Sequence, residues 1–258
     1  MSPASFERDG FVGPLVMLSA EELDAVRAAV EEVIHNLDAH RHRLYEVEAS
    51  YTERPDEVVC HFLGGFRVHP VLRELIFHER ITSTCAALLG VDRLRFWHDQ
   101  VFAKPPQHPG VVPWHQDYSY WTRTAPAKHI TCNLLLDDSD EASGCLQFVP
   151  QSHRWPLLPS IPFDSTLERI CDHLPAGANF TPVAVSAPAG SATFHHSHTL
   201  HGSDCNRSDR WRRAVVLNYM DAETRVADGS APLLRGVAAL PEGAVVEGDE
   251  FPIVFERA

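Results

Sequence analysis

The chain has 258 residues, 44% of them hydrophobic, and its formal net charge is −13 at pH 7. This length suits a mainly β fold with a sizeable buried core, so we expect one domain over residues 1–258. The negative charge disfavours nucleic acid and anionic membrane as partners, because both are bound by clustered Lys and Arg side chains.

The N-terminal segment, MSPASFERDGF, carries charged residues early and lacks the apolar run of a signal peptide. No later stretch approaches the length of a membrane-spanning helix. The six cysteines are scattered without a C-x-x-C pair, which is typical of reduced thiols. These features predict a cytoplasmic protein, and nothing in them indicates an oligomeric state.

Two helices are predicted in the first third of the chain. Ser19 and Glu22 form a capping-box pattern ahead of apolar residues at helical spacing, which predicts a helix from about Ala20 to His40. A second apolar pattern runs from Pro70 to Leu89, and Gly90 provides a stop signal. Both helices are expected to pack one apolar stripe against a sheet.

A polar stretch, residues 41–68, separates the two helices and is interpreted as a possible lid over a site. From Leu94 onward, short apolar runs alternate with breaks rich in Pro, Gly and Asp, which predicts β-strands. We therefore expect an α+β, mainly β fold with three parts: bracing helices in residues 1–93, a β core in 94–225 and a C-terminal extension in 226–258. The strand runs are LRFWHDQVFA, HITCNLLL, CLQFVP, PVAVSA, SATFHH and AVVLNYM.

The run WHQDYSYW places His115 and Asp117 two residues apart. In an extended segment both side chains project from one face, so one cation can accept both. A second histidine from elsewhere would complete the two-histidine, one-carboxylate facial triad that suits iron(II) and leaves coordination sites open. An isolated His-x-Asp pair is more often a hydrogen-bonded pair at a strand end.

Candidates for the second histidine lie in TFHHSHTLHGSDCNRSDRWRRA. The segment contains His195, His196, His198 and His201, and it ends in two arginines, Arg212 and Arg213. An arginine fork suits the far carboxylate of a 2-oxo acid that chelates iron through its keto acid end. Adjacent strand residues face opposite ways, so only one of the two arginines points inward, and spacing alone does not choose between them.

Four segments together resemble the phytanoyl-CoA dioxygenase family of iron(II) and 2-oxoglutarate-dependent oxygenases. They are FERDGFV, the K-P-P and W-H-Q-D residues between Lys104 and Asp117, LLLDD with SGCLQFVPQSHR, and HGSDCNRS with WRRA. The resemblance implies a double-stranded β-helix (jelly-roll) core. Among the alternatives, it implies His201 as the second histidine ligand and Arg212 as the arginine that points inward. The metal ligands and catalytic residues it implies are His115, Asp117 and His201, and the cosubstrate residues it implies are Arg212, Gln100, Asn133 and Ser203.

Two positions depart from the family pattern. Asn133 stands where the family often has an aromatic residue, and Gln151 stands where a glycine is usual, which suggests a different local backbone in that turn. Asp117 fills the position that halogenating relatives leave to a small residue, so halogenation is not expected. These departures leave the implied metal ligands in place.

The function predicted from these residues is a dioxygenase that uses Fe(II), 2-oxoglutarate and O2 to hydroxylate an unactivated C–H bond of a small metabolite in specialised (natural-product) metabolism. The same cofactors also support desaturation, cyclisation or epimerisation, and no residue pattern separates these outcomes. A metal- and 2-oxoglutarate-binding module without turnover, or a zinc site in a β-barrel, are alternatives from other classes. The triad together with an arginine anchor favours the enzyme.

Overall fold

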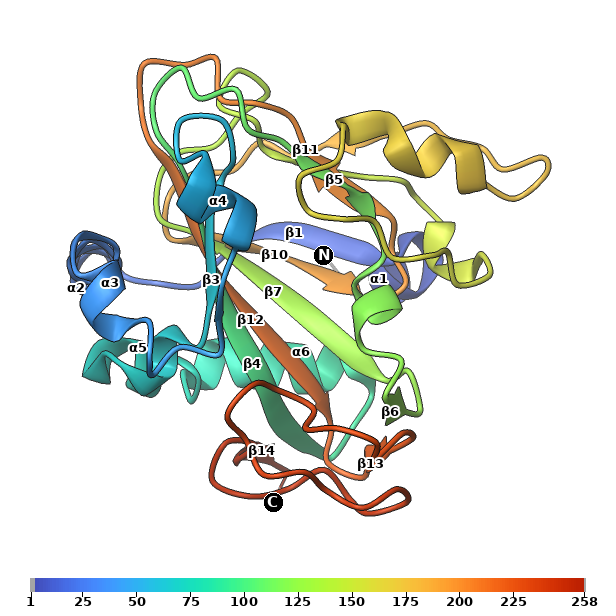
Figure 1. Cartoon of the computed structure of the whole chain (residues 1–258). Helices are drawn as coiled ribbons and strands as arrows, with labels where there is room; N and C mark the ends of the chain where they lie inside the picture. Colours follow the sequence, from blue (N-terminus) through green and yellow to red (C-terminus); the bar gives the residue numbers. More distant parts are fainter. Residues whose placement is uncertain (1–2, 258) are drawn as a thin grey trace.

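Two β-sheets form the centre of the computed structural model, which describes residues 3–257 (Figure 1). The larger sheet has the strand order β1-β10-β7-β12-β4-β3-β2, with β14 also pairing with β4. The smaller sheet has the order β5-β11-β8-β9, and β13 pairs with β6. With the two sheets facing each other, this is the expected double-stranded β-helix, and mixed α and β structure with strands predominating is confirmed.

The strands are β1 (Phe11–Val16), β2 (Glu46–Val47), β3 (Cys60–Leu63), β4 (Arg93–Lys104), β5 (Val112–His115), β6 (Thr124–Ala125), β7 (His129–Leu135), β8 (Leu146–Phe148), β9 (Val183–Ala184), β10 (Ser191–His196), β11 (His201–Ser203), β12 (Arg212–Asp221), β13 (Arg225–Val226) and β14 (Ile253–Glu256). The α-helices are α1 (Pro3–Asp9), α2 (Ala20–His35), α3 (Leu37–His40), α4 (Ala49–Glu53), α5 (Pro70–Leu75) and α6 (Glu79–Leu89). The 3-10 helices are η1 (Gly65–Arg67), η2 (Asp117–Tyr120), η3 (Ser152–Arg154) and η4 (Leu167–His173).

The predicted helices form, but each is interrupted. The capping box of Ser19 and Glu22 begins α2, and Asn36 ends it after His35 by turning its backbone out of the helical region, so the expected helix to His40 is split into α2 and α3. The second expected helix is split into α5 and α6 by the turn at residues 76–78. Gly90 ends α6 in the left-handed conformation, as its stop signal predicted.

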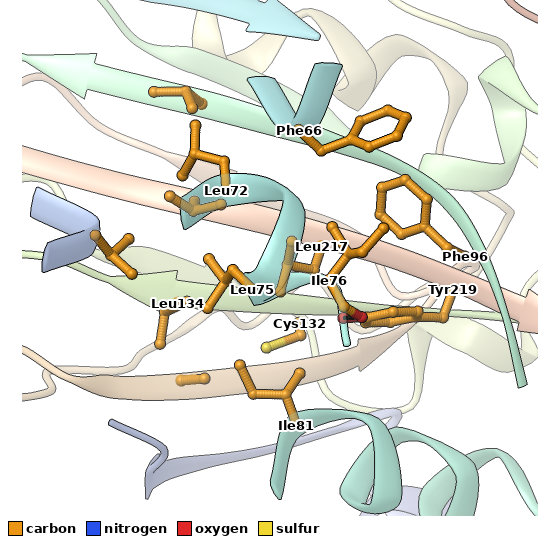
Figure 2. Packing of buried hydrophobic residues seen from close by; sticks show 14 of the residues in the cluster. Phe66, Leu72, Leu75, Ile76, Ile81, Phe96, Cys132, Leu134, Leu217 and Tyr219 are labelled. Carbon is orange, nitrogen blue, oxygen red and sulfur yellow. Dashed lines mark hydrogen bonds between the residues drawn. The ribbon is translucent and has the colours of Figure 1, made fainter. Parts of the chain in front are cut away.

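The outer face of the larger sheet forms the main core with the helices (Figure 2). Cys132 and Leu134 of β7 and Leu217 of β12 are fully or almost fully buried on this face. Helices α5 and α6 supply Leu72 and Ile81 to the same cluster. Each such aliphatic side chain contributes roughly 1.5–3 kcal/mol by leaving water, so this face anchors the sheet.

The inner face of the larger sheet is polar, because side chains alternate along each strand. Its residues are His195 on β10, Thr131 and Asn133 on β7, Arg212 and Asn218 on β12, and His98 and Gln100 on β4, all placed by the antiparallel register. Strands β1, β2 and β3 come from the predicted bracing segment, and β14 comes from the C-terminal extension. The larger sheet therefore draws strands from both flanking segments, and the expected division into three parts remains a prediction.

Residues 41–68, expected to be a lid, contribute β2, α4, β3 and η1 instead of a long irregular loop. All six cysteines are free thiols, as predicted. Among residues 3–257, no helix combines the length and the apolar character that a membrane crossing requires.

Candidate active site

Three side chains converge between the two sheets. His115 is the last residue of β5, Gln116 continues the extended backbone, and Asp117 begins η2. His201 begins β11 and pairs directly with His115 across the smaller sheet. One ligand atom from each of His115, Asp117 and His201 lies within 4.8 Å of the others, and among the described residues this is the one group of three or more His, Cys, Asp or Glu side chains that can hold a metal ion.

Both histidines are oriented by backbone carbonyl groups. Nδ1 of His115 lies 2.8 Å from the Pro113 carbonyl oxygen, and Nδ1 of His201 lies 2.9 Å from that of Thr199. Because a carbonyl only accepts, Nδ1 carries the proton in each ring and Nε2 keeps a free lone pair. These Nε2 atoms lie 3.5 and 3.7 Å from Oδ1 of Asp117. Two lone pairs and a carboxylate oxygen facing a common point suit a divalent cation such as iron(II).

The second carboxylate oxygen of Asp117 is held from behind. Oδ2 accepts hydrogen bonds from Oγ1 of Thr131 at 2.6 Å and from Nε2 of His195 at 3.0 Å. Burial alone would raise the pKa of Asp117, but His201, His115 and His195 outweigh it and hold the pKa well below its ordinary value. The carboxylate is therefore ionised and presents Oδ1 to the metal position.

The other candidate histidines take different places. His195 was a candidate ligand and instead contacts the carboxylate of Asp117. His196 and His198, the rivals to His201, lie outside the converging group; Nδ1 of His196 accepts from the backbone N–H of His198.

A small cavity of about 40 Å³ adjoins the triad, and Arg212 lies in its lining. The Arg212 side chain is 2% exposed, and its Nε and Nη2 atoms have no hydrogen-bond partner within residues 3–257. Burial lowers the pKa of Arg212 to about 10, so the guanidinium remains charged at neutral pH. An unpaired buried cation is costly, and a carboxylate entering the cavity would satisfy it with two parallel hydrogen bonds.

Arg213 faces the opposite side of β12. Its guanidinium binds both carboxylate oxygens of Asp137 at 2.8 Å and also pairs with Glu31 of helix α2. Strand alternation therefore separates the two arginines, with Arg212 towards the cavity and Arg213 towards the helices.

Two of the three remaining predicted cosubstrate residues line the small cavity, and the third does not. Gln100 and Asn133 line the small cavity. Ser203 is absent from that lining, and its hydroxyl instead accepts from Nζ of Lys104 at 2.6 Å. Lys104, the last residue of β4, is fully buried, and burial together with the charge of Arg212 lowers its pKa well below the ordinary value.

A larger cavity of about 190 Å³ also has His115 and Asp117 in its lining. Tyr120 and Trp121 line it too, and Trp121 packs with Trp97 in a small hydrophobic cluster behind. Its remaining aromatic lining includes Phe102 and Phe163. The two cavities together offer room for two small molecules beside one metal position.

Residues 156–165 form part of the wall of the larger cavity. The hydroxyl of Tyr120 donates to the Ile161 carbonyl oxygen at 2.5 Å and accepts from the Ile161 N–H at 3.2 Å. Arg54 near the end of α4 pairs with Asp164 at 2.9 Å. These contacts tie the wall both to the metal-binding segment and to α4.

Similarity to known proteins extends over most of the chain. The family model described as phytanoyl-CoA dioxygenase (PhyH) matches residues 6–214. The ectoine dioxygenase of Bordetella parapertussis is 27% identical over 235 residues, which cover 84% of this chain and 74% of that protein.

Two crystal structures from nogalamycin biosynthesis are similar over 98% of the chain. The non-haem α-ketoglutarate-dependent carbocyclase SnoK has a TM-score of 0.77 and 26% sequence identity, with 94% of its chain covered. The non-haem α-ketoglutarate-dependent epimerase SnoN has a TM-score of 0.76 and 26% identity, with 96% covered. SnoN has also been crystallised with Fe3+, α-ketoglutarate and nogalamycin RO.

Proposed function

The chain belongs to the phytanoyl-CoA dioxygenase family of 2-oxoglutarate-dependent non-haem iron dioxygenases, with Fe(II), 2-oxoglutarate and O2 as cofactors, and from this premise we propose that it hydroxylates an unactivated C–H bond of a small metabolite. We place it in specialised, natural-product metabolism, because the similar carbocyclase and epimerase come from nogalamycin biosynthesis. The free cysteines fit a cytoplasmic location.

The observation that carries this proposal is the position of Arg212. A buried guanidinium with two unpartnered nitrogen atoms lies in a small cavity that also contains His115, Asp117 and His201. A dicarboxylate that chelates a metal at one end and meets arginine at the other fits both features. A zinc site for hydrolysis or for structure would not need this second anchor.

In the proposed enzyme, His115, Asp117 and His201 bind iron(II), and Arg212 binds the far carboxylate of 2-oxoglutarate. When bound, these cofactors and O2 supply the oxidising power that breaks a C–H bond. The chain's own contribution is to fix geometry: His195 and Thr131 hold Asp117, and the hydrogen bond from Tyr120 to Ile161 fixes part of the wall of the larger cavity.

Hydroxylation is the default outcome, and desaturation, cyclisation and epimerisation are the alternatives that use the same cofactors. The similar proteins include a dioxygenase, a carbocyclase and an epimerase, so family membership alone leaves the outcome open. Mass analysis of the product decides it: a gain of one oxygen atom supports hydroxylation, and an isomer or a dehydrogenated product excludes it.

The first test is anaerobic reconstitution with Fe(II) and 2-oxoglutarate, followed by visible spectroscopy of the weak charge-transfer band of the chelate. We expect the band in the wild-type protein and a much weaker band at the same 2-oxoglutarate concentration in Arg212→Ala. Absence of the band in verified iron-loaded wild-type protein would argue against the oxygenase function and for a metal site of another kind.

A further inference from the structure

The inner face of the larger sheet continues from β4 through β3 onto β2, and this register determines where Glu46 lies. Glu46 pairs with Leu63, and Leu63 pairs with Gln100, so these three side chains share one face. The neighbours on the opposite face, Val47 and Phe62, are buried in the helix-covered core. Strand pairing therefore holds Glu46 over the larger cavity, whose lining includes it.

The lining of the larger cavity contains two glutamates, Glu46 and Glu48, and it contains no Lys or Arg. Glu48 caps α4 by accepting a hydrogen bond from the Ser50 N–H at 3.1 Å. Glu46 is exposed at the edge of the cavity, and its side chain has neither a hydrogen bond nor a salt bridge within residues 3–257. Partial burial of its carboxyl and the nearby charge of Glu48 raise the pKa of Glu46, while the charge of Arg235 acts in the opposite direction. A positive charge at this edge of the cavity would stabilise both carboxylates.

Deeper in the cavity, the hydrogen-bond pattern determines which ring nitrogen of His98 carries the proton. Oδ2 of Asp117 only accepts, so Thr131 donates its single hydroxyl proton to it at 2.6 Å. Thr131 then has no proton left for the side-chain amide of Asn218, which lies 3.0 Å away. The structure has Oδ1 of Asn218 facing Thr131 and Nδ2 facing Nδ1 of His98, an orientation that sets two acceptors against each other at Thr131. The reversed amide, with its NH2 group towards Thr131 and its oxygen atom towards His98, satisfies both contacts.

With that orientation, Nδ1 of His98, 3.2 Å from the Asn218 amide, is the nitrogen that carries the proton. Burial lowers the pKa of His98 to about 3, so the ring is neutral and Nε2 keeps a lone pair. His98 is 2% exposed and lines the larger cavity. The cavity therefore contains a buried hydrogen-bond acceptor, in addition to the carboxylates at its edge.

Aromatic rings form much of the remaining wall. The ring of His61 stacks on Phe102 at 4.4 Å and on Phe163 at 4.7 Å between centroids. Tyr120 and Trp121 complete this part of the lining. Aromatic faces pack against an apolar body and attract a cation.

We propose that the substrate is a small organic cation, an apolar or aromatic molecule that bears a protonated amine. Its ammonium group binds at Glu46 and Glu48, its body packs against the aromatic wall, and a donor group on it meets Nε2 of His98. The net charge of −13 attracts such a molecule and repels polyanions such as coenzyme A thioesters. This inference rests on the proposed function in taking the larger cavity as the substrate site.

The test compares three probes with one phenyl ring and different charge: 2-phenylethylamine, its neutral N-acetyl derivative, and the anionic 3-phenylpropionate. Anaerobic isothermal titration calorimetry measures their binding to the protein with and without Fe(II) and 2-oxoglutarate, so no turnover is needed. We expect the amine to bind at least about tenfold more tightly than either analogue, as a charge-assisted contact provides.

Two variants test whether the preference for the amine arises at Glu46. Glu46→Gln removes the charge while keeping the side-chain shape, and it should weaken binding of the amine by about tenfold and leave the neutral probe unchanged. Glu53→Gln removes a charge from the exposed end of α4 outside the cavity lining, and it should change neither. Circular dichroism of both variants checks that they fold.

Equal or weaker binding of the amine than of the N-acetyl probe, or no measurable binding of the amine, would overturn the inference. So would an equal effect of Glu46→Gln and Glu53→Gln. The chelate band is recorded on the same samples. If the band forms and the amine shows no preference, the substrate class alone is wrong, whereas a missing band argues against the proposed oxygenase itself.

Discussion

Nε2 of His195 lies 3.0 Å from Oδ2 of Asp117, and this contact leaves Oδ1 as the carboxylate oxygen that faces the two histidine ligands. His195 is 1% exposed, so the hydrogen bond is formed away from water. Groups that hydrogen-bond to a metal ligand fix its orientation and increase affinity for the metal. His195 is therefore expected to act on the metal through Asp117.

His195→Ala should weaken binding of Fe(II) by roughly 10- to 100-fold, because Asp117 loses one of the two groups that hold it. Anaerobic competition with a chelator measures the affinity directly. His196→Ala is the matched control: the neighbouring residue lies outside the converging group, and its loss should leave the affinity within about twofold. Equal losses in both variants would show that His195 contributes only to folding.

The two adjacent arginines should give opposite phenotypes. Arg212→Ala should raise the KM for 2-oxoglutarate by about 30-fold or more, because truncating one partner of a buried charge pair costs about 2–5 kcal/mol. Arg213→Ala should leave this KM nearly unchanged and lower the thermal midpoint, since its partners are Asp137 and Glu31. Steady-state assays and differential scanning calorimetry separate the two effects, and a similar rise in KM in both variants contradicts the assignment.

Asp99 predicts a pH effect on stability. Its side chain is buried beside η1, where Oδ2 accepts from the Phe66 N–H at 2.9 Å, and burial raises its pKa to about 7. Because the pKa of Asp99 is higher in the folded state than in the unfolded state, the protonated carboxyl stabilises the fold. This stabilisation of the folded state is complete below about pH 4, and it is lost as the pH rises through about 7.

Asp99→Asn keeps a neutral group of the same shape at every pH. Its stability relative to the wild type should therefore rise between pH 5 and pH 8, by about 3 kcal/mol. Urea unfolding at a series of pH values provides the measurement. Parallel stability curves for the two proteins would mean that Asp99 is not protonated preferentially in the folded state.

Gln151 should be replaceable by glycine with a gain in stability. Its backbone has φ of 67°, a left-handed conformation that costs an L-residue about 1 kcal/mol. Gln151→Gly should therefore stabilise the fold by about 0.5 kcal/mol, after the greater freedom of glycine in the unfolded chain is subtracted. Gln107 is the comparison, with φ of 57°; its side chain donates to the Arg207 and Ser208 carbonyl oxygens, so Gln107→Gly should bring no gain. Chemical denaturation measures both.

Local patterns predicted much of this architecture. The capping box of Ser19 and Glu22, the stop at Gly90 and the apolar runs of the long strands depend on neighbouring residues, and all of them appear in the structure. The helix breaks at Asn36 and at residues 76–78 were not predicted, because the apolar spacing continues through both. The short strand β3 depends on pairing with distant β4, and β2 depends on pairing with β3, which no local pattern reveals.

The environment of single polar residues was harder to predict. Lysine is usually found in solvent, yet Lys104 is buried, because Ser203 and the Asp204 carbonyl, about a hundred positions further along the chain, accept hydrogen bonds from its Nζ. His195 was considered only as a ligand. Alternation along SATFHH contained a usable signal: Phe194 packs in the core, so His195 must face the other side of the strand, together with Thr193.

The two faces of the larger sheet have a practical consequence for directed evolution. Outer-face side chains such as Leu134 and Leu217 determine whether the chain folds, whereas inner-face side chains such as Glu46, Leu63 and Phe102 contact the space beside the metal position. A mutant library restricted to these three cavity-lining positions would vary substrate preference while leaving the helix-packed side and the proposed iron and 2-oxoglutarate residues intact. Most of its members should therefore express as folded protein, so a screen would report on catalysis more than on solubility.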